Sequence, residues 1–133
     1  MSEAQQIRVL IVDDHELFTE ALTATLEQDD RFHVVGTAKT GREAVRLAKT
    51  ARADVVLMDM SMPVLDGLAA TRRLLSLEHA PRVIALSGHT DRLSQTAALD
   101  SGASVFVSKS EPLDTLTETI VDVCAERAQP AGG

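Results

Sequence analysis

Several short apolar runs in this sequence end on side chains that could carry out phosphoryl transfer. In chain order these side chains are Asp13 and Asp14, then Asp59, then Ser87 beside Gly88, and finally Lys109. Clustered carboxylates repel one another unless a cation lies among them, and a set of carboxylate oxygens suits Mg²⁺. Asp59 could then act as a nucleophile toward phosphorus, while Lys109 and the Ser87 hydroxyl stabilise the transferred phosphoryl oxygens. The pattern therefore predicts transfer of a phosphoryl group onto a carboxylate.

Each of these residues also has an ordinary structural explanation. An isolated Lys109 would be a solvated surface residue, and Ser87-Gly88 would be a simple turn. Asp13-Asp14 could mark a helix N-terminus, and Asp59 could cap the turn after its strand. The joint pattern places acids after the first and third strands, a hydroxyl after the fourth and a lysine after the fifth. That order is far more specific than any single residue, so the functional interpretation is favoured.

The elements that must position these side chains are predicted to alternate between strand and helix. The run 55–58 is apolar throughout and is flanked by Asp54 and Asp59, as expected for a central parallel strand covered on both faces. Further strands are predicted at 8–12, 32–38, 83–86 and 105–107, with helices between them and after the last. The sequence therefore predicts an α/β fold with about five parallel strands. The strand ends of such a sheet meet along one edge.

Helix boundaries and inward faces are predicted for several helices. Thr40 and Glu43 have the spacing of a capping box, Gly102 is expected as a left-handed cap, and Pro112 is expected at a first helical position. The inward faces expected from helical spacing are Leu17, Ala21, Leu22 and Leu26 in the first helix, Leu93, Ala97 and Ala98 in the fourth, and Leu113, Leu116, Ile120 and Val123 in the last.

Length, charge and cysteine content narrow the class of protein. The chain has 133 residues, enough for one domain, and 44% of them are hydrophobic. A net charge of −7 without a basic run argues against direct contact between this domain and nucleic acid. The single cysteine, Cys124, excludes an internal disulfide and favours a cytoplasmic location, and no apolar run approaches the ~20 residues that span a membrane. Residues 1–6 are expected to form a leader and residues 127–133 a linker-like tail.

The sequence resembles the receiver domain of two-component response regulators in three segments. These are Val9 to His15 (Val-Leu-Ile-Val-Asp-Asp-His), Asp54 to Pro63 (Asp-Val-Val-Leu-Met-Asp-Met-Ser-Met-Pro) and Asp66-Gly67. The Asp-Asp-His start, Val-Val-Gly in the second strand and residues 67–73 are most similar to the NarL/FixJ (LuxR-type) branch. The resemblance covers roughly residues 7–126. It implies one receiver domain with a CheY-like (flavodoxin-like) fold, a doubly wound parallel sheet of five strands with five helices.

The resemblance also implies a role for each candidate residue. Asp59 corresponds to the phosphoacceptor. Mg²⁺ would be held by Asp13, Asp14, Asp59 and the backbone carbonyl of Ser61. The phosphoryl-binding and switch residues would be Ser87, Gly88, Lys109 and Phe106, with Phe106 as the aromatic switch.

Three positions depart from the most common receiver sequence or bear on how long a phosphoryl group persists. Ser110 follows Lys109 where many receivers have proline, so the rigidity of that loop is expected to differ. Ser61 and His89 lie two residues after Asp59 and Ser87, at positions that tune dephosphorylation in the family.

The partners follow from the same resemblance. A sensor histidine kinase would donate the phosphoryl group, and phosphorylation would promote a homodimer. The chain would catalyse only its own phosphoryl transfer and autodephosphorylation. The output would be transcription regulation through a C-terminal helix-turn-helix DNA-binding domain outside this sequence. The alternative is a stand-alone receiver that acts through protein contacts.

Other phosphoryl chemistries fit the sequence less well. The segment 36–41 resembles a P-loop only superficially, because Arg42-Glu43 stands where Lys-Ser/Thr is required. An aspartyl-phosphate hydrolase would show Asp-x-Asp at the nucleophile, whereas Met60-Ser61 follows Asp59 here. A receiver that binds without phosphorylation is disfavoured because every expected site residue is present.

Overall fold

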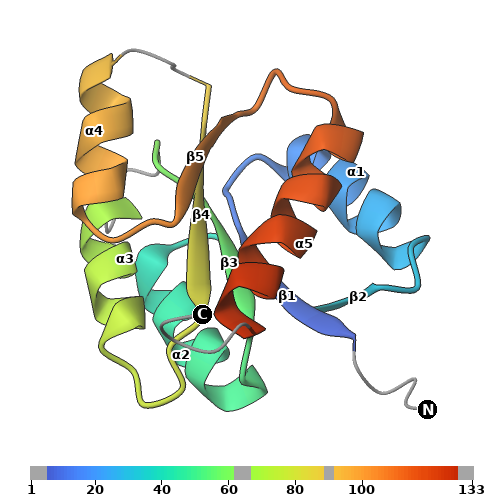
Figure 1. Cartoon of the computed structure of the whole chain (residues 1–133), viewed down its shortest axis with the longest axis horizontal. Helices are drawn as coiled ribbons and strands as arrows, with labels where there is room; N and C mark the ends of the chain where they lie inside the picture. Colours follow the sequence, from blue (N-terminus) through green and yellow to red (C-terminus); the bar gives the residue numbers. More distant parts are fainter. Residues whose placement is uncertain (1–5, 62–66, 89–91, 129–133) are drawn as a thin grey trace.

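A computed structural model describes residues 6–61, 67–88 and 92–128. Its five strands form one parallel sheet in the order β2-β1-β3-β4-β5, with a helix after every strand (Figure 1). The strands are β1 (Ile7–Val12), β2 (Phe32–Ala38), β3 (Val55–Asp59), β4 (Arg82–Ser87) and β5 (Val105–Ser108). The helices are α1 (Glu16–Glu27), α2 (Gly41–Ala51), α3 (Gly67–Leu75), α4 (Arg92–Asp100) and α5 (Leu113–Ala128). This is the predicted doubly wound, CheY-like topology.

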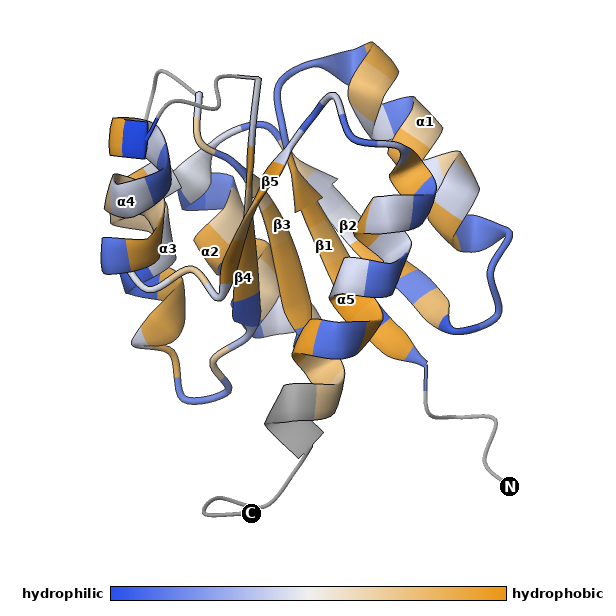
Figure 2. Ribbon diagram, turned by 45° about the horizontal axis from the view of Figure 1, so that its top comes forward, coloured by the Kyte–Doolittle hydropathy of each residue, from blue (hydrophilic) through white to orange (hydrophobic). Residues whose placement is uncertain are grey.

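Two helical layers cover the sheet, with α1 and α5 on one face and α2, α3 and α4 on the other (Figures 1 and 2). Alternation along β1 follows from the twofold repeat of a strand. Val9 and Ile11 pack into the core under α1 and α5, whereas Leu10 and Val12 pack into the core under the other three helices. Two cores of this kind require strands that are apolar on both faces, and β1 and β3 meet that requirement.

Strand β3 lies at the centre of the sheet, between β1 and β4. All five of its residues are buried, and the register pairs Val56 with Leu10 on one side and with Val83 on the other. The apolar run that predicted this strand therefore reflects burial on both faces. Its last residue, Asp59, is the one polar side chain in the run and lies at the carboxyl edge of the sheet.

The expected helix ends are confirmed with small differences. Thr40 Oγ1 accepts the backbone N–H of Glu43 at 3.1 Å, while the Glu43 side chain accepts from the backbone N–H of Lys39. Gly102 has a φ of +116°, as a left-handed cap requires. Pro112 immediately precedes α5 instead of being its first helical residue, and its carbonyl accepts from Thr115 N.

Three predicted core positions are wrong. Leu17 is 82% exposed, Leu93 is 83% exposed, and Ala21 is exposed as well. In α1 the inward face is set by Phe18, Leu22 and Leu26, which recur every fourth residue. Leu17 and Ala21 share that same spacing one residue earlier, about 100° away around the helix, and both are exposed. Spacing alone did not separate the two faces.

The expected inward face of α5 is confirmed, because its four residues all pack into the core shared with α1.

At the amino end of the chain, Gln6 belongs to the expected leader, yet its Nε2 donates hydrogen bonds to the backbone carbonyls of Asp30 and Phe32. Among the residues that the structure describes, no helix has the length and apolar character needed to cross a membrane.

Candidate functional site

The carboxyl ends of β1, β3, β4 and β5 bring the predicted residues to one edge of the sheet. Backbone hydrogen bonds continue past the strand ends and fix this edge. Asp13 N donates to Ala38 O at 2.9 Å, and Lys109 N donates to Ser87 O at 2.9 Å. The strand-end residues Asp13, Asp59, Ser87 and Lys109 are therefore held by the sheet and not by flexible loops.

The acidic residues at this edge differ in burial. The side chains of Asp13 and Asp59 are fully buried, whereas that of Asp14 is 39% exposed. Burying two carboxylates close together is costly unless cations neutralise them. The two buried carboxylates therefore need a nearby positive charge to stabilise them.

Lys109 supplies one positive charge to these carboxylates. Its Nζ lies 2.7 Å from Asp13 Oδ2 and 3.4 Å from Asp59 Oδ2, and its side chain is only 15% exposed. On its other side the ammonium group lies 4.9 Å from the centroid of the Phe18 ring, which is within the range of a cation–π contact. The hydroxyls of Ser108 and Ser110 lie 2.7 Å apart on either side of Lys109. The Lys109–Ser110 bond is trans, as are all peptide bonds in the described ranges.

Asp59 combines burial with an unused hydrogen-bond acceptor. Its Oδ1 accepts the backbone N–H of Ser61 at 2.9 Å, whereas Oδ2 is buried and accepts no hydrogen bond. Burial raises the pKa of Asp59 above its ordinary value, and the negative charge of Asp13 adds to the rise, although the Ser61 N–H and Lys109 partly oppose it. A buried carboxylate oxygen with a free lone pair is suited to bind a cation or to attack phosphorus.

The pKa of Asp13 is shifted in the opposite direction, below its ordinary value. Burial is the largest single influence on its pKa and raises it, but hydrogen bonds from Lys109 and from the backbone of His15 outweigh burial and leave the pKa below its ordinary value. The two buried carboxylates thus differ: Asp13 is held in its charged form, and Asp59 is less well compensated.

His15, the residue just before α1, also belongs to the site, although it was not among the predicted site residues. Its Nδ1 lies 3.0 Å from Asp13 Oδ1, 3.5 Å from Asp14 Oδ1 and 3.3 Å from Lys109 Nζ. Phe18 was also missed. Both lie within four residues of the acidic pair, and the spacing from His15 to Phe18 is about one helical turn. That spacing was a usable signal.

Ser87, Gly88 and Phe106 lie at or near this edge. Ser87 is buried at the end of β4 in register with Ser108, and Gly88 follows with open space around its Cα. Phe106 is half-buried, pairs with Ala85 and packs against the core under α2, α3 and α4. His89, the other predicted dephosphorylation residue, lies outside the described residues.

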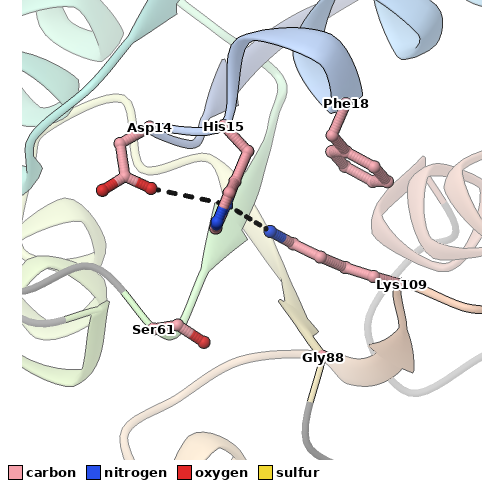
Figure 3. Close-up of a pocket in the computed structure, with 6 residues that line it drawn as sticks. All are labelled: Asp14, His15, Phe18, Ser61, Gly88 and Lys109. Carbon is pink, nitrogen blue, oxygen red and sulfur yellow. Dashed lines mark hydrogen bonds and ion pairs between the residues drawn. The ribbon is translucent and has the colours of Figure 1, made fainter.

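A pocket of about 630 Å³ opens above these groups (Figure 3). Its lining residues are Asp14, His15, Phe18, Ser61, Gly88 and Lys109. Figure 3 shows His15 between the Asp14 carboxylate and the Lys109 ammonium. The pocket therefore gives access to the acidic edge and carries a cation on its inner wall.

The donor set fits a divalent cation. Asp13, Asp14, His15 and Asp59 each offer one ligand atom, and these atoms lie within 4.8 Å of one another. The buried Asp59 Oδ2, which accepts no hydrogen bond, supplies an oxygen that a cation would satisfy. Carboxylate oxygens at such spacing are typical ligands of hard divalent ions.

Comparison with known proteins agrees with this geometry. The family model described as the response regulator receiver domain matches residues 9–121. The response regulator UvrY of Escherichia coli (strain K12) is 41% identical over 103 residues, which cover 77% of this chain and 47% of UvrY. A protein-glutamate methylesterase/protein-glutamine glutaminase of Halalkalibacterium halodurans is 36% identical over 129 residues, covering 95% of this chain and 37% of that protein.

The solved signal receiver domain of NarL from Mycobacterium tuberculosis superimposes with a TM-score of 0.86 at 31% identity, covering 91% of this chain and 98% of that one. By contrast, the chain spans about half or less of the length of the curated relatives it matches first. The similarity therefore extends over a receiver domain. The chain belongs to the response regulator receiver domain family of two-component systems, in its NarL/FixJ (LuxR-type) branch.

Proposed function

We propose that Asp59 is the phosphoacceptor of this receiver domain and takes its phosphoryl group from a sensor histidine kinase. The observation that carries the proposal is the fully buried Asp59 carboxylate at the sheet edge, whose Oδ2 accepts no hydrogen bond and lies 3.4 Å from Lys109 Nζ. A reactive carboxylate beside a fixed cation is the arrangement that phosphoryl transfer requires.

In the proposed reaction, a carboxylate oxygen of Asp59 attacks the phosphorus of a phosphohistidine. An O–P bond forms and the P–N bond breaks, and its electron pair returns to the imidazole nitrogen of the kinase, which then takes up a proton from water. Lys109 is placed to hold negative charge on the transferred oxygens, since its Nζ is already within 3.4 Å of Asp59 Oδ2. The adjacent pocket offers the space through which the donor group approaches.

The proposed cofactor is Mg²⁺, held by Asp13, Asp14, Asp59 and the backbone carbonyl of Ser61. When bound, it would neutralise charge on the carboxylates and on the incoming phosphoryl group. The chain's own part is to present the ligands: β1 and β3 fix Asp13 and Asp59, and the Ser61 N–H fixes the orientation of the Asp59 carboxylate. Ser61 and His89 are proposed to tune the rate at which the phosphoryl group is later lost.

The proposed switch links the phosphoryl group to the surface near β5. The phosphorylated Asp59 side chain carries about two negative charges, against one on the free carboxylate, and they attract the Ser87 hydroxyl, the backbone of Gly88 and Lys109. Phe106 would then rotate into the space that Ser87 leaves and repack the surface formed by α4, β5 and α5. The pairing of Ala85 with Phe106, two register steps before Ser87, supports this coupling, because a shift at the end of β4 is adjacent to β5. Phosphorylation acts by favouring one of two pre-existing arrangements.

The proposed output is transcription regulation through a DNA-binding helix-turn-helix domain in a protein of which residues 7–126 are the receiver. Relatives such as the transcriptional regulatory protein DegU of Brevibacillus brevis support it, since this chain covers 49% of DegU. A phosphorylation-promoted homodimer belongs to the same proposal, as does the view that the chain catalyses only its own phosphoryl transfer and autodephosphorylation. The cytoplasmic location stays a prediction, as does the assignment of residues 1–6 as leader and 127–133 as tail.

The test is intact mass after incubation with acetyl phosphate, with Mg²⁺ and with EDTA. We expect one phosphoryl adduct that needs Mg²⁺ and is absent from Asp59→Asn. Asp54→Asn is the matched control, because Asp54 lies at the opposite end of β3 and its Oδ2 accepts Arg8 N at 2.9 Å. Retention of the adduct in Asp59→Asn, or its absence in the wild-type chain, would overturn the proposal.

A further inference from the structure

We propose that His15 supplies a nitrogen ligand to the cation in the acidic site and thereby gives the site a preference for transition-metal ions over Mg²⁺. The inference rests on the proposed function only in that both use the same cation position. Carboxylates and a backbone carbonyl explain Mg²⁺ binding without any histidine. His15 therefore adds something that the proposed function does not need.

Distances around His15 match those between ligands of one metal ion. Two ligands about 2.1 Å from an ion lie about 3.0 Å apart at a right angle, 3.4 Å apart at a tetrahedral angle and 4.2 Å apart when opposite. His15 Nδ1 lies 3.0 Å from Asp13 Oδ1, 3.5 Å from Asp14 Oδ1 and 3.9 Å from Asp59 Oδ2. All three separations fall within that range, so Nδ1 is placed as a ligand among the carboxylates.

The Lys109 ammonium lies beside the proposed cation position. Lys109 Nζ pairs with Asp13 Oδ2 at 2.7 Å, and it also lies 3.4 Å from Asp59 Oδ2 and 3.3 Å from His15 Nδ1. Asp13 Oδ1, by contrast, faces His15 Nδ1 at 3.0 Å. An ion bound between His15, Asp14 and Asp59 would replace the contacts of the ammonium with His15 and Asp59, while Lys109 keeps its ion pair with Asp13 Oδ2.

A second observation points independently to a bound cation. Asp59 is fully buried, and its Oδ2 accepts no hydrogen bond among the described residues, although Lys109 Nζ lies 3.4 Å from it. A buried charged oxygen rarely lacks a hydrogen bond or a ligated ion. The same atom is 3.9 Å from His15 Nδ1, so the ion that satisfies it would also be within reach of the imidazole.

The chemical consequence follows from ligand type. Mg²⁺ prefers oxygen ligands and gains little from an imidazole. Imidazole nitrogen suits Zn²⁺, Cu²⁺ and Ni²⁺, whose affinities for nitrogen sites exceed that of Mn²⁺. A site with three carboxylates and His15 should therefore bind Zn²⁺ more tightly than an all-oxygen receiver site. The 64% exposure of the His15 side chain leaves it free to adjust to the ion.

The experiment is isothermal titration calorimetry with Mg²⁺ and with Zn²⁺ on the wild-type chain, His15→Ala and His33→Ala. His33 is the matched control, because it is exposed on β2 at the end of that strand remote from Ala38, which bonds Asp13. Loss of a metal ligand should weaken Zn²⁺ binding by at least about tenfold in His15→Ala, the lower limit for loss of a supporting residue. Mg²⁺ affinity should change by less than about threefold, since no oxygen ligand is removed.

A spectroscopic readout identifies the nitrogen directly. Electron spin-echo envelope modulation of the Mn²⁺ complex should show ¹⁴N coupling in the wild type and in His33→Ala, and none in His15→Ala. Absence of ¹⁴N coupling in the wild type, or equal losses of Mg²⁺ and Zn²⁺ affinity in His15→Ala, would overturn the inference. An acetyl phosphate adduct with either result leaves the proposed function standing, whereas ¹⁴N coupling without any adduct would overturn only the proposed function.

Discussion

Lys109 Nζ lies 2.7 Å from Asp13 Oδ2, and this ion pair joins the end of β5 to the end of β1 across the two strands between them. The same ammonium is 3.4 Å from Asp59 Oδ2. One ammonium group thus lies closer to Asp13 than to Asp59. Its hydrogen bond outweighs the effect of burial at Asp13, with help from His15, and the pKa of Asp13 is lowered. At Asp59 the effect of burial prevails, and the pKa is raised. The less compensated carboxylate is the one proposed to react.

Replacing Asp59 by Asn should stabilise the metal-free protein. Because the pKa of Asp59 is raised in the folded state, its charged form costs free energy above that pKa, and the cost disappears below the ordinary value. Relief of a buried, unsatisfied acceptor is worth about 1–3 kcal/mol. Urea unfolding in EDTA should show this gain at pH 7.5 and a smaller gain as the pH falls through the raised pKa.

The matched control for this prediction is Asp54→Asn. Asp54 accepts a backbone N–H from Arg8 and should not raise the free energy of unfolding when replaced. An equal gain in both variants would show that net charge, and not the burial of Asp59, is responsible. The comparison is informative because the chain carries a net charge of −7.

The strand ends of this site could be predicted from the sequence because β3 and its neighbours are buried on both faces. The apolar run ends at the buried Asp59, so it marks the carboxyl end of the strand, where the candidate reactive side chains lie. Parallel strands then oblige Asp13, Asp59, Ser87 and Lys109 to share an edge, whatever the loops do. For these residues, a position at the end of a strand in the sequence is enough to predict a position at the carboxyl edge of the sheet.

The position of Phe18 could not be predicted in the same way. It depends on how α1 is rotated about its axis, and α1 carries two apolar rows of similar strength, one through Phe18 and Leu22 and one through Leu17 and Ala21. Only packing against α5 and the sheet selects the Phe18 row. Once that row faces inward, Phe18 lies beside Lys109 and Leu17 is left exposed.

Replacing Lys109 by Met should destabilise the metal-free protein by about 1–3 kcal/mol at pH 7, because two buried carboxylates lose their cation. The loss should shrink when Mg²⁺ is added, since a divalent ion replaces the missing charge. Urea unfolding with and without Mg²⁺ measures both effects. Lys49→Met, at an exposed position in α2, should change stability by less than about 0.5 kcal/mol. A loss in Lys109→Met that Mg²⁺ does not reduce would contradict the electrostatic explanation.

Replacing Gly102 by Ala should cost more than about 1 kcal/mol, because its φ of +116° is unfavourable for any residue with a Cβ. The new Cβ would also clash with Leu75 Cδ1. Gly36→Ala is the control, since its Cβ would meet only ordinary contacts at 3.7 Å and 3.8 Å. The double variant Gly102→Ala/Leu75→Ala separates the two causes: backbone strain persists in it and the clash does not. Full recovery of stability there would contradict the backbone explanation.

Replacing Phe18 by Leu tests whether the aromatic ring positions Lys109. Leu keeps the apolar packing against the α1–α5 core but removes the negative ring face that lies 4.9 Å from the ammonium. A cation–π contact is worth about 0.5–1 kcal/mol, so the rate of phosphorylation by acetyl phosphate should fall about two- to fivefold. Phe18→Tyr keeps a ring face and should restore the rate, while unfolding in urea should change little in either variant. If Leu and Tyr behave alike, the ring contributes packing alone, and Lys109 is positioned by Asp13 and Asp59 without it.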